Sequence, residues 1–329
     1  MTILVTGSAG HLGEAILRTL QSSGKRAIGV DIKASPFTTH MGTIADRDFV
    51  KKAMSGVEAV IHTATLHKPH VATHSRQDFV DTNITGTLNL LEEAAAQGLQ
   101  RFVFTSTTSV FGNALVPPPG APAAWITEDV RPIPKNIYGV TKSAAEDLCE
   151  LMHKKLRLPC LVLRTSRFFP EEDDNKAKRD AFADDNAKSS EFLFRRVDVE
   201  DAVSAHLNAM ERAPRLGFGK YIISATSPFQ QEDLPLLQLD APAVVEKYVP
   251  AYRAEYDKRH WRMFPTIDRV YVNKKARRDL DWQPKLDFHA VIERLSAGES
   301  WRSPLAQLIG LKGYHDQIFE DGPYPVEDR

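Results

Sequence analysis

Short apolar runs alternate with longer amphipathic stretches along the first 165 residues. A short apolar run bounded by polar or glycine positions is typical of a buried strand, whereas apolar positions that recur every three or four residues predict a helix. The runs that predict strands cover residues 3–5, 26–31, 59–62, 101–105 and 160–164, and those that predict helices cover 11–21, 75–96 and 137–156. Strands that alternate with helices predict an α/β fold, in which a doubly wound parallel sheet carries helices on both faces.

Two segments interrupt this rhythm. Residues 116–134 are rich in proline and predict a surface loop, and residues 170–190 carry a dense run of charges. Such a charged run is typical of a mobile lid or a solvated loop, with a charged recognition site as the alternative. A helix over 197–210 and a strand over 221–224 are expected next, and the remainder of the chain is helix-rich.

The composition is that of an ordinary folded protein, with 42% hydrophobic and 26% charged residues. The formal net charge is −1, so we expect neither nucleic acid nor an anionic membrane surface as a partner. Two cysteines, Cys149 and Cys160, are too few for a disulfide framework and favour a reducing compartment. The first residues already read as a strand and a turn, and no apolar run reaches the roughly 18 residues of a membrane span. The expected location is the cytoplasm.

Three glycines, Gly7, Gly10 and Gly13, lie between the first predicted strand and the first predicted helix, with the spacing G-x-x-G-x-x-G. Glycines permit a tight turn and a close approach of the backbone to a pyrophosphate, and the N-terminus of the helix directs free N–H groups at the anion. A plain glycine turn is the alternative, but the strand–turn–helix context favours a dinucleotide site. Three further residues of the loop are candidate contacts: Ala9, His11 and Leu12.

Asp31 ends the second predicted strand. A carboxylate there can accept hydrogen bonds from both ribose hydroxyls of adenosine and would repel a 2′-phosphate. This favours NAD as the cofactor, although Lys33 would offset part of that repulsion and leaves NADP possible. We therefore expect a Rossmann-type NAD-binding domain over residues 1–165, to which residues of about 196–225 return. Residues 166–195 and 226–329 are expected to form a smaller, helix-rich substrate domain.

Tyr138 and Lys142 lie four residues apart at the start of a predicted helix, so that both side chains share one face. To act as a base, the tyrosine needs a pKa near ~7 in place of ~10, which costs about 4 kcal/mol. An ammonium group ~4 Å away, at an effective dielectric constant of ~20, contributes about 4 kcal/mol. The pair therefore fits a proton transfer by Tyr138, assisted by Lys142, that accompanies hydride transfer to or from a nicotinamide.

Together with this pair, several stretches in order along almost the whole chain resemble the extended short-chain dehydrogenase/reductase family. That family contains nucleotide-sugar epimerases, dehydratases and related reductases. The stretches are residues 60–64, 83–91, 102–112, 126–129, 197–201 and 280–284. The resemblance implies an NAD-dependent enzyme that exchanges hydride at a hydroxyl or carbonyl carbon.

The resemblance also implies roles for particular residues. Thr107 stands where the family places a catalytic serine or threonine that hydrogen-bonds the reacting oxygen, with Thr108 as the alternative if the alignment slips by one residue. Asn83 resembles the residue that ties a helix to a strand near the nicotinamide. Ile44 would pack near adenine, although Thr43 stands where the family commonly has aspartate. Further cofactor contacts are implied at Thr63, Ala64, Thr65, Thr105, Ser106 and Arg164, in addition to Tyr138 and Lys142.

Two departures from the family concern the substrate. Arg167 stands where its nucleotide-sugar enzymes usually carry asparagine, and the span from there to residues 195–196 is shorter than in those enzymes. Both argue against a standard nucleotide-sugar site. Arg167 either meets a carboxylate or phosphate of a different substrate or forms a structural ion pair.

Three histidines, His67, His70 and His74, follow the third predicted strand near the expected entrance for substrate. No nearby cysteine or paired carboxylate completes a zinc site, and the chemistry of the family uses no metal, so we expect no metal site. His67 is the best candidate for a contact with substrate or nicotinamide, and a solvated or packed ring is the alternative.

The leading hypothesis is an NAD-dependent dehydrogenase or reductase that acts on a sugar-like or polyhydroxylated small molecule. The alternative is a nucleotide-sugar epimerase similar to UDP-glucose 4-epimerase, with no net redox change. A dehydratase is disfavoured because Thr108 stands where those enzymes use an acidic residue. A non-catalytic NAD sensor is disfavoured because Tyr138 and Lys142 are both present.

A homodimer is also expected. In relatives, the helices that correspond to 75–96 and 137–156 often pair across a two-fold axis. Leu148, Leu151 and Met152 are apolar enough to serve this contact, but they fit the internal core equally well.

Overall fold

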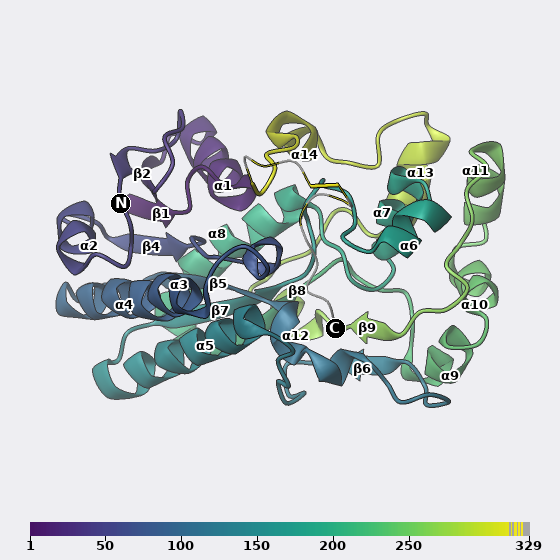
Figure 1. Ribbon diagram of the computed structural model, residues 1–329, viewed down its shortest axis with the longest axis horizontal. Coiled ribbons are helices and arrows are strands. Elements are labelled where there is room, and N and C mark those ends of the chain that lie inside the picture. Colours follow the sequence, from purple (N-terminus) through teal and green to yellow (C-terminus); the bar gives the residue numbers. More distant parts are fainter. Residues whose placement is uncertain (316, 318, 321, 323, 325–329) are drawn as a thin grey trace.

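The computed structural model describes residues 1–315, 317, 319, 320, 322 and 324. At its centre is a parallel sheet of seven strands in the order β3-β2-β1-β4-β5-β7-β8 (Figure 1). The strands are β1 (Thr2–Thr6), β2 (Arg26–Asp31), β3 (His40–Met41), β4 (Ala59–His62), β5 (Phe102–Thr107), β7 (Cys160–Thr165) and β8 (Phe218–Ile223). Because β1 pairs with both β2 and β4, the strand order reverses beside β1, and the predicted doubly wound Rossmann-type fold is confirmed.

Each face of the sheet packs against its own layer of helices. Successive side chains of a strand point to opposite faces. Ile3 and Val5 therefore pack with α1 (His11–Ser22) and α8 (Val199–Leu216), whereas Leu4 packs on the opposite side. That opposite layer contains α2 (Arg47–Ala53), α4 (Gly86–Ala96) and α5 (Ile137–Leu156) (Figure 1).

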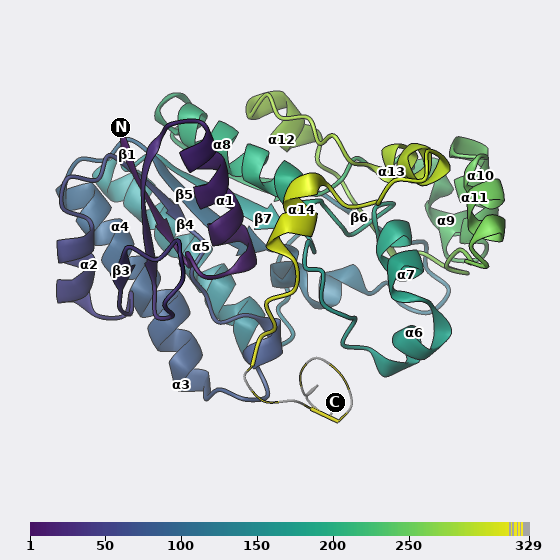
Figure 2. The ribbon, with the colours of Figure 1, turned by 90° about the horizontal axis from the view of Figure 1, so that it is seen from above.

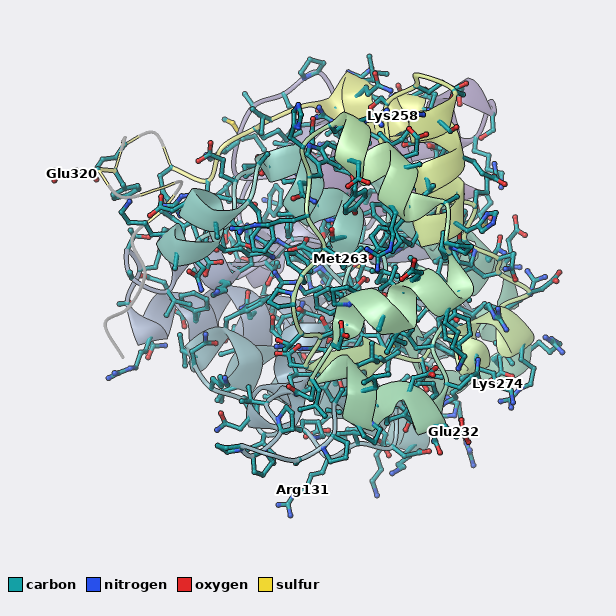
Figure 3. The ribbon with its side chains drawn as sticks, turned by 90° about the vertical axis from the view of Figure 1, so that its right-hand side faces the viewer. Arg131, Glu232, Lys258, Met263, Lys274 and Glu320 are labelled. Atoms are coloured by element: carbon teal, nitrogen blue, oxygen red, sulfur yellow. The ribbon has the colours of Figure 1, made fainter. Side chains whose placement is uncertain are left out.

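A helix-rich region continues beyond the carboxyl ends of the strands (Figure 2). Its aromatic core includes Phe192, Tyr256, Phe288 and Trp301, all buried. Figure 3 looks onto this region, with Met263 near the centre of the view and Lys258 and Glu232 nearer its margins. The helices outside the two layers are α6 (Lys176–Ala181), α7 (Asp184–Glu191), α9 (Leu234–Leu237), α10 (Ala241–Tyr248), α11 (Tyr252–Lys258) and α13 (Phe288–Ser296). Two further short helices, α12 (Lys274–Asp279) and α14 (Pro304–Ile309), pack in the same core cluster as α1 and α8.

The proline-rich segment is more ordered than predicted. Residues 124–126 form strand β6 (Ala124–Ile126), which pairs in parallel with β9 (Arg269–Tyr271). The partner strand lies far along the chain, so the local pattern, dominated by prolines, gave no sign of it. This small sheet joins the proline-rich loop to the helix-rich region.

The predicted helix over 75–96 is interrupted. It consists of α3 (Arg76–Phe79), a π-helical segment (Val80–Thr85) and α4. Gly86 begins α4 beneath Ile44, where a β-carbon on residue 86 would lie only 2.5 Å from Cγ1 of Ile44. A π-helical turn adds a residue to the helical repeat and reorients the side chains on it. Asn83 lies within this turn.

The second half of the charged segment over 170–190 forms a helix. This corrects the prediction of a mobile lid or solvated loop for that part of the segment. Helix α7 is largely buried: Asn186, Ser189 and Ser190 are at most 2% exposed. Its Glu191 lies among arginine and lysine side chains. Ion pairing therefore allows a strongly charged stretch to pack inside the protein.

Both cysteines are buried and free. None of the helices in the described part of the chain combines the length and the apolar character that crossing a bilayer requires.

Candidate active site

A cavity of about 600 Å³ lies at the carboxyl ends of the strands, between the glycine loop and the helix-rich region. Open parallel sheets bind ligands at this edge, and the volume is within the range of small-molecule sites. Most of the predicted site residues line it: Gly7, Ala9, Gly10, His11, Leu12, Gly13, Asp31, Ile44, Thr63, Ala64, Thr65, His67, Thr105, Ser106, Thr107, Thr108, Tyr138 and Arg167. Asn83, Lys142 and Arg164 lie outside this lining.

The glycine loop has no room for larger residues. Gly7 has a φ of +73°, and a β-carbon there would lie 2.8 Å from the backbone nitrogen of Ala64. A β-carbon on Gly13 would lie 2.0 Å from the carbonyl oxygen of Gly7. Gly10 is the N-cap of α1, so the first N–H groups of that helix lie beside the loop. This is the arrangement in which a pyrophosphate can approach the backbone closely.

Asp31 and Ile44 are both held in place by hydrogen bonds to the main chain. The Asp31 carboxylate accepts from the backbone N–H groups of Ala9 and Lys33, each at 2.9 Å. The Asn89 side chain donates to the carbonyl oxygen of Ile44 at 3.0 Å. The two residues predicted to contact the adenosine part of a dinucleotide are therefore both fixed and both on the wall of the cavity.

Tyr138, Thr107 and Lys142 come together where β5 meets α5. The side chain of Asn136 caps α5 by accepting from the N–H of Gly139 at 3.1 Å, which places Tyr138 and Lys142 in the first turns of the helix. The Tyr138 and Thr107 side chains both line the cavity, and Thr107 is near enough to the phenol to influence its pKa. The Lys142 ammonium group donates to the carbonyl oxygen of Thr105 at 2.7 Å, beneath the cavity wall.

These features are shared with a known group of proteins. Residues 3–221 match the family model described as "NAD dependent epimerase/dehydratase family". The chain belongs to this family. The match contains the glycine loop, Thr107 and the Tyr138/Lys142 pair.

Two relatives carry names that state different activities, an epimerase and a reductase. UDP-glucose 4-epimerase 4 of Oryza sativa subsp. japonica is 30% identical over an alignment of 184 positions, gaps included. The alignment covers 50% of this chain and 48% of that protein. The 2-alkyl-3-oxoalkanoate reductase of Stenotrophomonas maltophilia is 28% identical over an alignment of 340 positions, gaps included, which covers 91% of this chain and 100% of that protein. The chain spans only 40% to 48% of the length of the first curated relatives it matches.

A solved structure supports the same fold. A short-chain dehydrogenase/reductase superfamily protein from Agrobacterium tumefaciens, crystallised with bound NAD, has a TM-score of 0.64 and 22% identity to this chain. The likeness covers 90% of this chain and 96% of that one. At this identity it shows the fold alone.

Burial opposes the charged forms of both members of the Tyr/Lys pair. It raises the pKa of Tyr138 to about 12, although the neighbouring Thr107 side chain acts in the opposite direction. It lowers the pKa of Lys142 to about 7. The expectation that Lys142 alone lowers the Tyr138 pKa is therefore corrected: without further positive charge in the cavity, the cost of desolvating the phenolate is larger.

Asn83 lies outside the cavity lining and supports the wall through hydrogen bonds. Its side chain accepts from the N–H of Leu66 and donates to the Thr141 hydroxyl, at 2.9 and 3.0 Å. It therefore ties the π-helical segment both to the loop after β4 and to α5. This is the kind of connection that its resemblance implied, and it supports the helix that carries Tyr138.

Arg164 is a structural residue, which corrects its predicted contact with the cofactor. Its side chain is 2% exposed and forms an ion pair with Glu146, with 2.8 Å between Nη2 and Oε2. It also donates to the carbonyl oxygen of Glu128. Glu146 accepts in addition from the Ser106 hydroxyl at 2.6 Å. The buried guanidinium therefore has its partners inside the protein, beneath β5 and β7.

Arg167 and His67 also line the cavity. Arg167 Nη1 lies 2.7 Å from an Asp173 oxygen, so the predicted structural ion pair is present, and the arginine also lines the cavity. The His67 ring stacks on Phe169 with 5.3 Å between ring centroids. Burial and the neighbouring His70 hold the His67 pKa well below its usual value, so the ring is neutral. Among the described residues, no cluster of three or more histidine, cysteine, aspartate or glutamate side chains could hold a metal ion.

Sequence reasoning missed a part of the wall that comes from the end of the chain. Lys312, Gly313, Tyr314 and Tyr324 line the cavity. The backbone N–H groups of Lys312 and Gly313 donate to Glu171 at 3.0 and 3.2 Å. Glu171 in turn lies 2.8 Å from Nε2 of His11 in the glycine loop.

The same segment is attached on its other side, because His315 Nε2 lies 2.9 Å from the carbonyl oxygen of Pro69. We call residues 310–315 the C-terminal strap. It crosses the cavity between the glycine loop and the loop that carries His67. No local pattern signals such contacts, since His315 and Pro69 are 246 positions apart and Lys312 and Glu171 are 141 apart.

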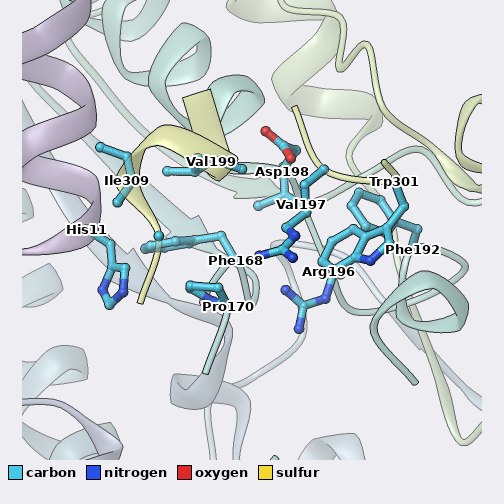
Figure 4. A pocket seen from close by; sticks show the side chains of 13 residues that line it. His11, Phe168, Pro170, Phe192, Arg196, Val197, Asp198, Val199, Trp301 and Ile309 are labelled. Carbon is cyan, nitrogen blue, oxygen red and sulfur yellow. The ribbon is translucent and has the colours of Figure 1, made fainter. Parts of the chain in front are cut away.

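A second, much smaller cavity of about 20 Å³ lies behind the strap and the start of α1. Figure 4 shows His11, Phe168 and Pro170 on one side of it, with Ile309 above and Arg196 opposite. This space is sufficient for about one water molecule, so it is not a second ligand site.

Proposed function

We propose that this family member is an NAD-dependent oxidoreductase that transfers hydride at a hydroxyl or carbonyl carbon of a sugar-like or polyhydroxylated substrate. The observation that carries the proposal is that Tyr138 and Thr107 lie together on the wall of the same cavity that the glycine loop lines. The Lys142 amine lies directly beneath them, bound to the carbonyl oxygen of Thr105. A proton-transfer group and a dinucleotide site thus open into one space.

The glycine loop and Asp31 fit the cofactor. The loop can adopt its tight turn because Gly7 and Gly13 lack β-carbons that would collide with the neighbouring backbone, and Asp31 presents a carboxylate to the cavity. The carboxylate supports NAD over NADP. When bound, the cofactor accepts hydride from the substrate carbon or returns it.

The protein's own groups move the proton. Thr107 would hold the reacting oxygen by a hydrogen bond, and Tyr138 would take the hydroxyl proton during oxidation or give it during reduction. Because burial raises the pKa of Tyr138 to about 12, the phenolate needs positive charge nearby. Protonated Lys142 supplies part of that charge, and its pKa of about 7 means that it loses the proton readily above neutral pH.

Epimerisation of a nucleotide sugar is the second candidate, because the same residues serve it and several relatives are named UDP-glucose 4-epimerases. The reductase from Stenotrophomonas maltophilia, matched over nearly all of this chain, favours net redox chemistry. Incubation of the purified protein with NAD and a panel of free and nucleotide-linked sugars separates the two. Accumulation of NADH supports the oxidoreductase, whereas interconversion of two sugar nucleotides without NADH, seen by NMR, supports the epimerase.

We further propose that residues 166–195 and 226–329 hold the substrate, and that the protein works as a cytoplasmic homodimer. On α5, Leu151 and Val140 are nearly half exposed, which supports a contact between copies. Met152 belongs to the internal core, and Leu148 packs against it, so these two residues do not contribute to that surface. Sedimentation of the wild type against Leu151→Glu tests the dimer, which should dissociate in the variant.

A further inference from the structure

Arg167 lies close to the proposed reacting groups because of strand register. Thr165, the last residue of β7, is paired with Thr107, the last residue of β5. Arg167 follows two positions later, and its backbone N–H donates to the carbonyl oxygen of Arg195 at 3.2 Å. Two arginines are therefore held next to each other, and both line the cavity.

The wall that carries these arginines has more positive than negative charge among the described residues. Three carboxylates, Asp173, Asp174 and Glu191, lie at its centre. The cationic side chains within 4.0 Å of them are Lys68, Arg167, Lys178, Arg195 and Arg196. Five cations against three carboxylates leave an excess of two positive charges. Arg179, which donates to the carbonyl oxygen of Asp173, is not included in this count.

The carboxylates do not use up the hydrogen-bonding capacity of Arg167. Its Nη1 donates to Asp173, and its other N–H groups have no hydrogen-bond partner in the described part of the chain. The side chain is 23% exposed, whereas that of Arg196 is 2% exposed and is bound to Glu191 and the carbonyl oxygen of Phe169. Arg167 therefore still has donors available to a ligand.

We propose that Arg167, with Arg195 beside it, binds an anionic oxyacid group of the substrate, a carboxylate or a phosphate. An arginine fork suits either group, and an excess of positive charge attracts both. The inference rests on the proposed function and narrows its substrate class: a neutral polyol would leave the excess charge unmatched. The anionic group would lie beside Arg167 and Arg195 on the cavity wall.

The experiment compares matched probes on the NAD-loaded, full-length protein at constant ionic strength. Thermal shifts are measured with D-glucuronate, D-glucose 6-phosphate and D-glucose, and apparent dissociation constants are taken from the dose dependence. We expect at least one anionic probe to bind about tenfold or more tightly than glucose. The two anionic probes distinguish a carboxylate from a phosphate. Equal stabilisation by glucose, or none by either anion, would overturn the proposal.

Variants then assign the effect to Arg167. Arg167→Gln should abolish the preference for the anion, and Arg167→Lys, which keeps the charge but loses the fork, should weaken it. Lys178→Gln is the matched control, since it removes one charge from the same cluster but does not line the cavity, and it should keep most of the preference. Persistence of the full preference in both Arg167 variants would also overturn the proposal.

The proposed anion site and the proposed function can be disproved independently of each other. If NAD stabilises the protein and Tyr138-dependent turnover is found, but neutral substrates are preferred, the anion site fails and the proposed function stands. If NAD does not bind, the proposed function fails whatever the anions do.

Discussion

The Asp31 carboxylate accepts a hydrogen bond from the backbone N–H of Ala9, with 2.9 Å between oxygen and nitrogen. The same carboxylate accepts from the N–H of Lys33 and lines the cavity. One side chain therefore connects the end of β2 to the glycine loop and also places negative charge where a ribose hydroxyl or a 2′-phosphate would lie. We expect this charge to select between NAD and NADP.

Asp31→Asn tests that selection because it keeps an acceptor oxygen of similar shape and removes the charge. The ratio of the NADP to the NAD dissociation constant should fall about tenfold or more, which corresponds to roughly 1.4 kcal/mol. Fluorescence titration with each cofactor measures the ratio. Asp46→Asn, at the N-cap of α2 and outside the cavity lining, is the control. An unchanged ratio in Asp31→Asn would show that the carboxylate does not discriminate.

The C-terminal strap should slow release of the cofactor. Glu171 joins the strap to His11, so Glu171→Ala removes these contacts and leaves the Lys312–Glu14 ion pair as the remaining attachment on that side. We expect the NAD dissociation rate, measured by stopped-flow displacement, to rise about tenfold, since hydrogen bonds to a charged group are worth about 1.5–3 kcal/mol. Glu172→Ala, which removes the exposed neighbouring carboxylate, should leave the rate unchanged. Equal rates in the two variants would argue against the strap as a barrier to release.

The buried amine of Lys142 should make the free energy of unfolding depend on pH. Burial lowers its pKa from 10.5 to about 7, so between these values the unfolded chain binds a proton that the folded protein does not. The free energy of unfolding therefore rises with pH in this window, by up to about 1.36 kcal/mol per pH unit from this residue. Lys142→Met should lose that rise, as measured by urea unfolding of the cofactor-free protein between pH ~7 and ~9.

Lys154→Met provides the control, because Lys154 is 66% exposed at the other end of the same helix. It should keep the pH slope of the wild type. If Lys142→Met kept it as well, the amine would not be desolvated in the folded state.

The sequence predicts the structure correctly where a feature depends on residues that are close together along the chain. The glycine spacing, the strand that ends at Asp31 and the one-turn separation of Tyr138 and Lys142 are all short-range features, and each depends on the geometry of a single element. The alternation of strands and helices likewise predicted the sheet and both helical layers. The glycine loop, Asp31 and Tyr138, which belong to these short-range features, all line the cavity.

The errors have a common physical cause, which is contact between distant parts of the chain. Arg164 was assigned to the cofactor because the Glu146 that neutralises it lies on a different element. The hydrophobic pattern over 75–96 predicts one helix, and the π-helical segment within it depends on contacts of Asn83 with the loop after β4 and with α5. The strap was missed for the same reason.

Whether the Tyr138 phenol is the proton-transfer group is tested most directly by turnover and NAD affinity in Tyr138→Phe, with Tyr248→Phe, a tyrosine outside the cavity lining, as the control. The account predicts that Tyr138→Phe loses turnover by about 10²–10⁴-fold and binds NAD within about twofold of the wild type, while Tyr248→Phe keeps both. Wild-type turnover in Tyr138→Phe would contradict it.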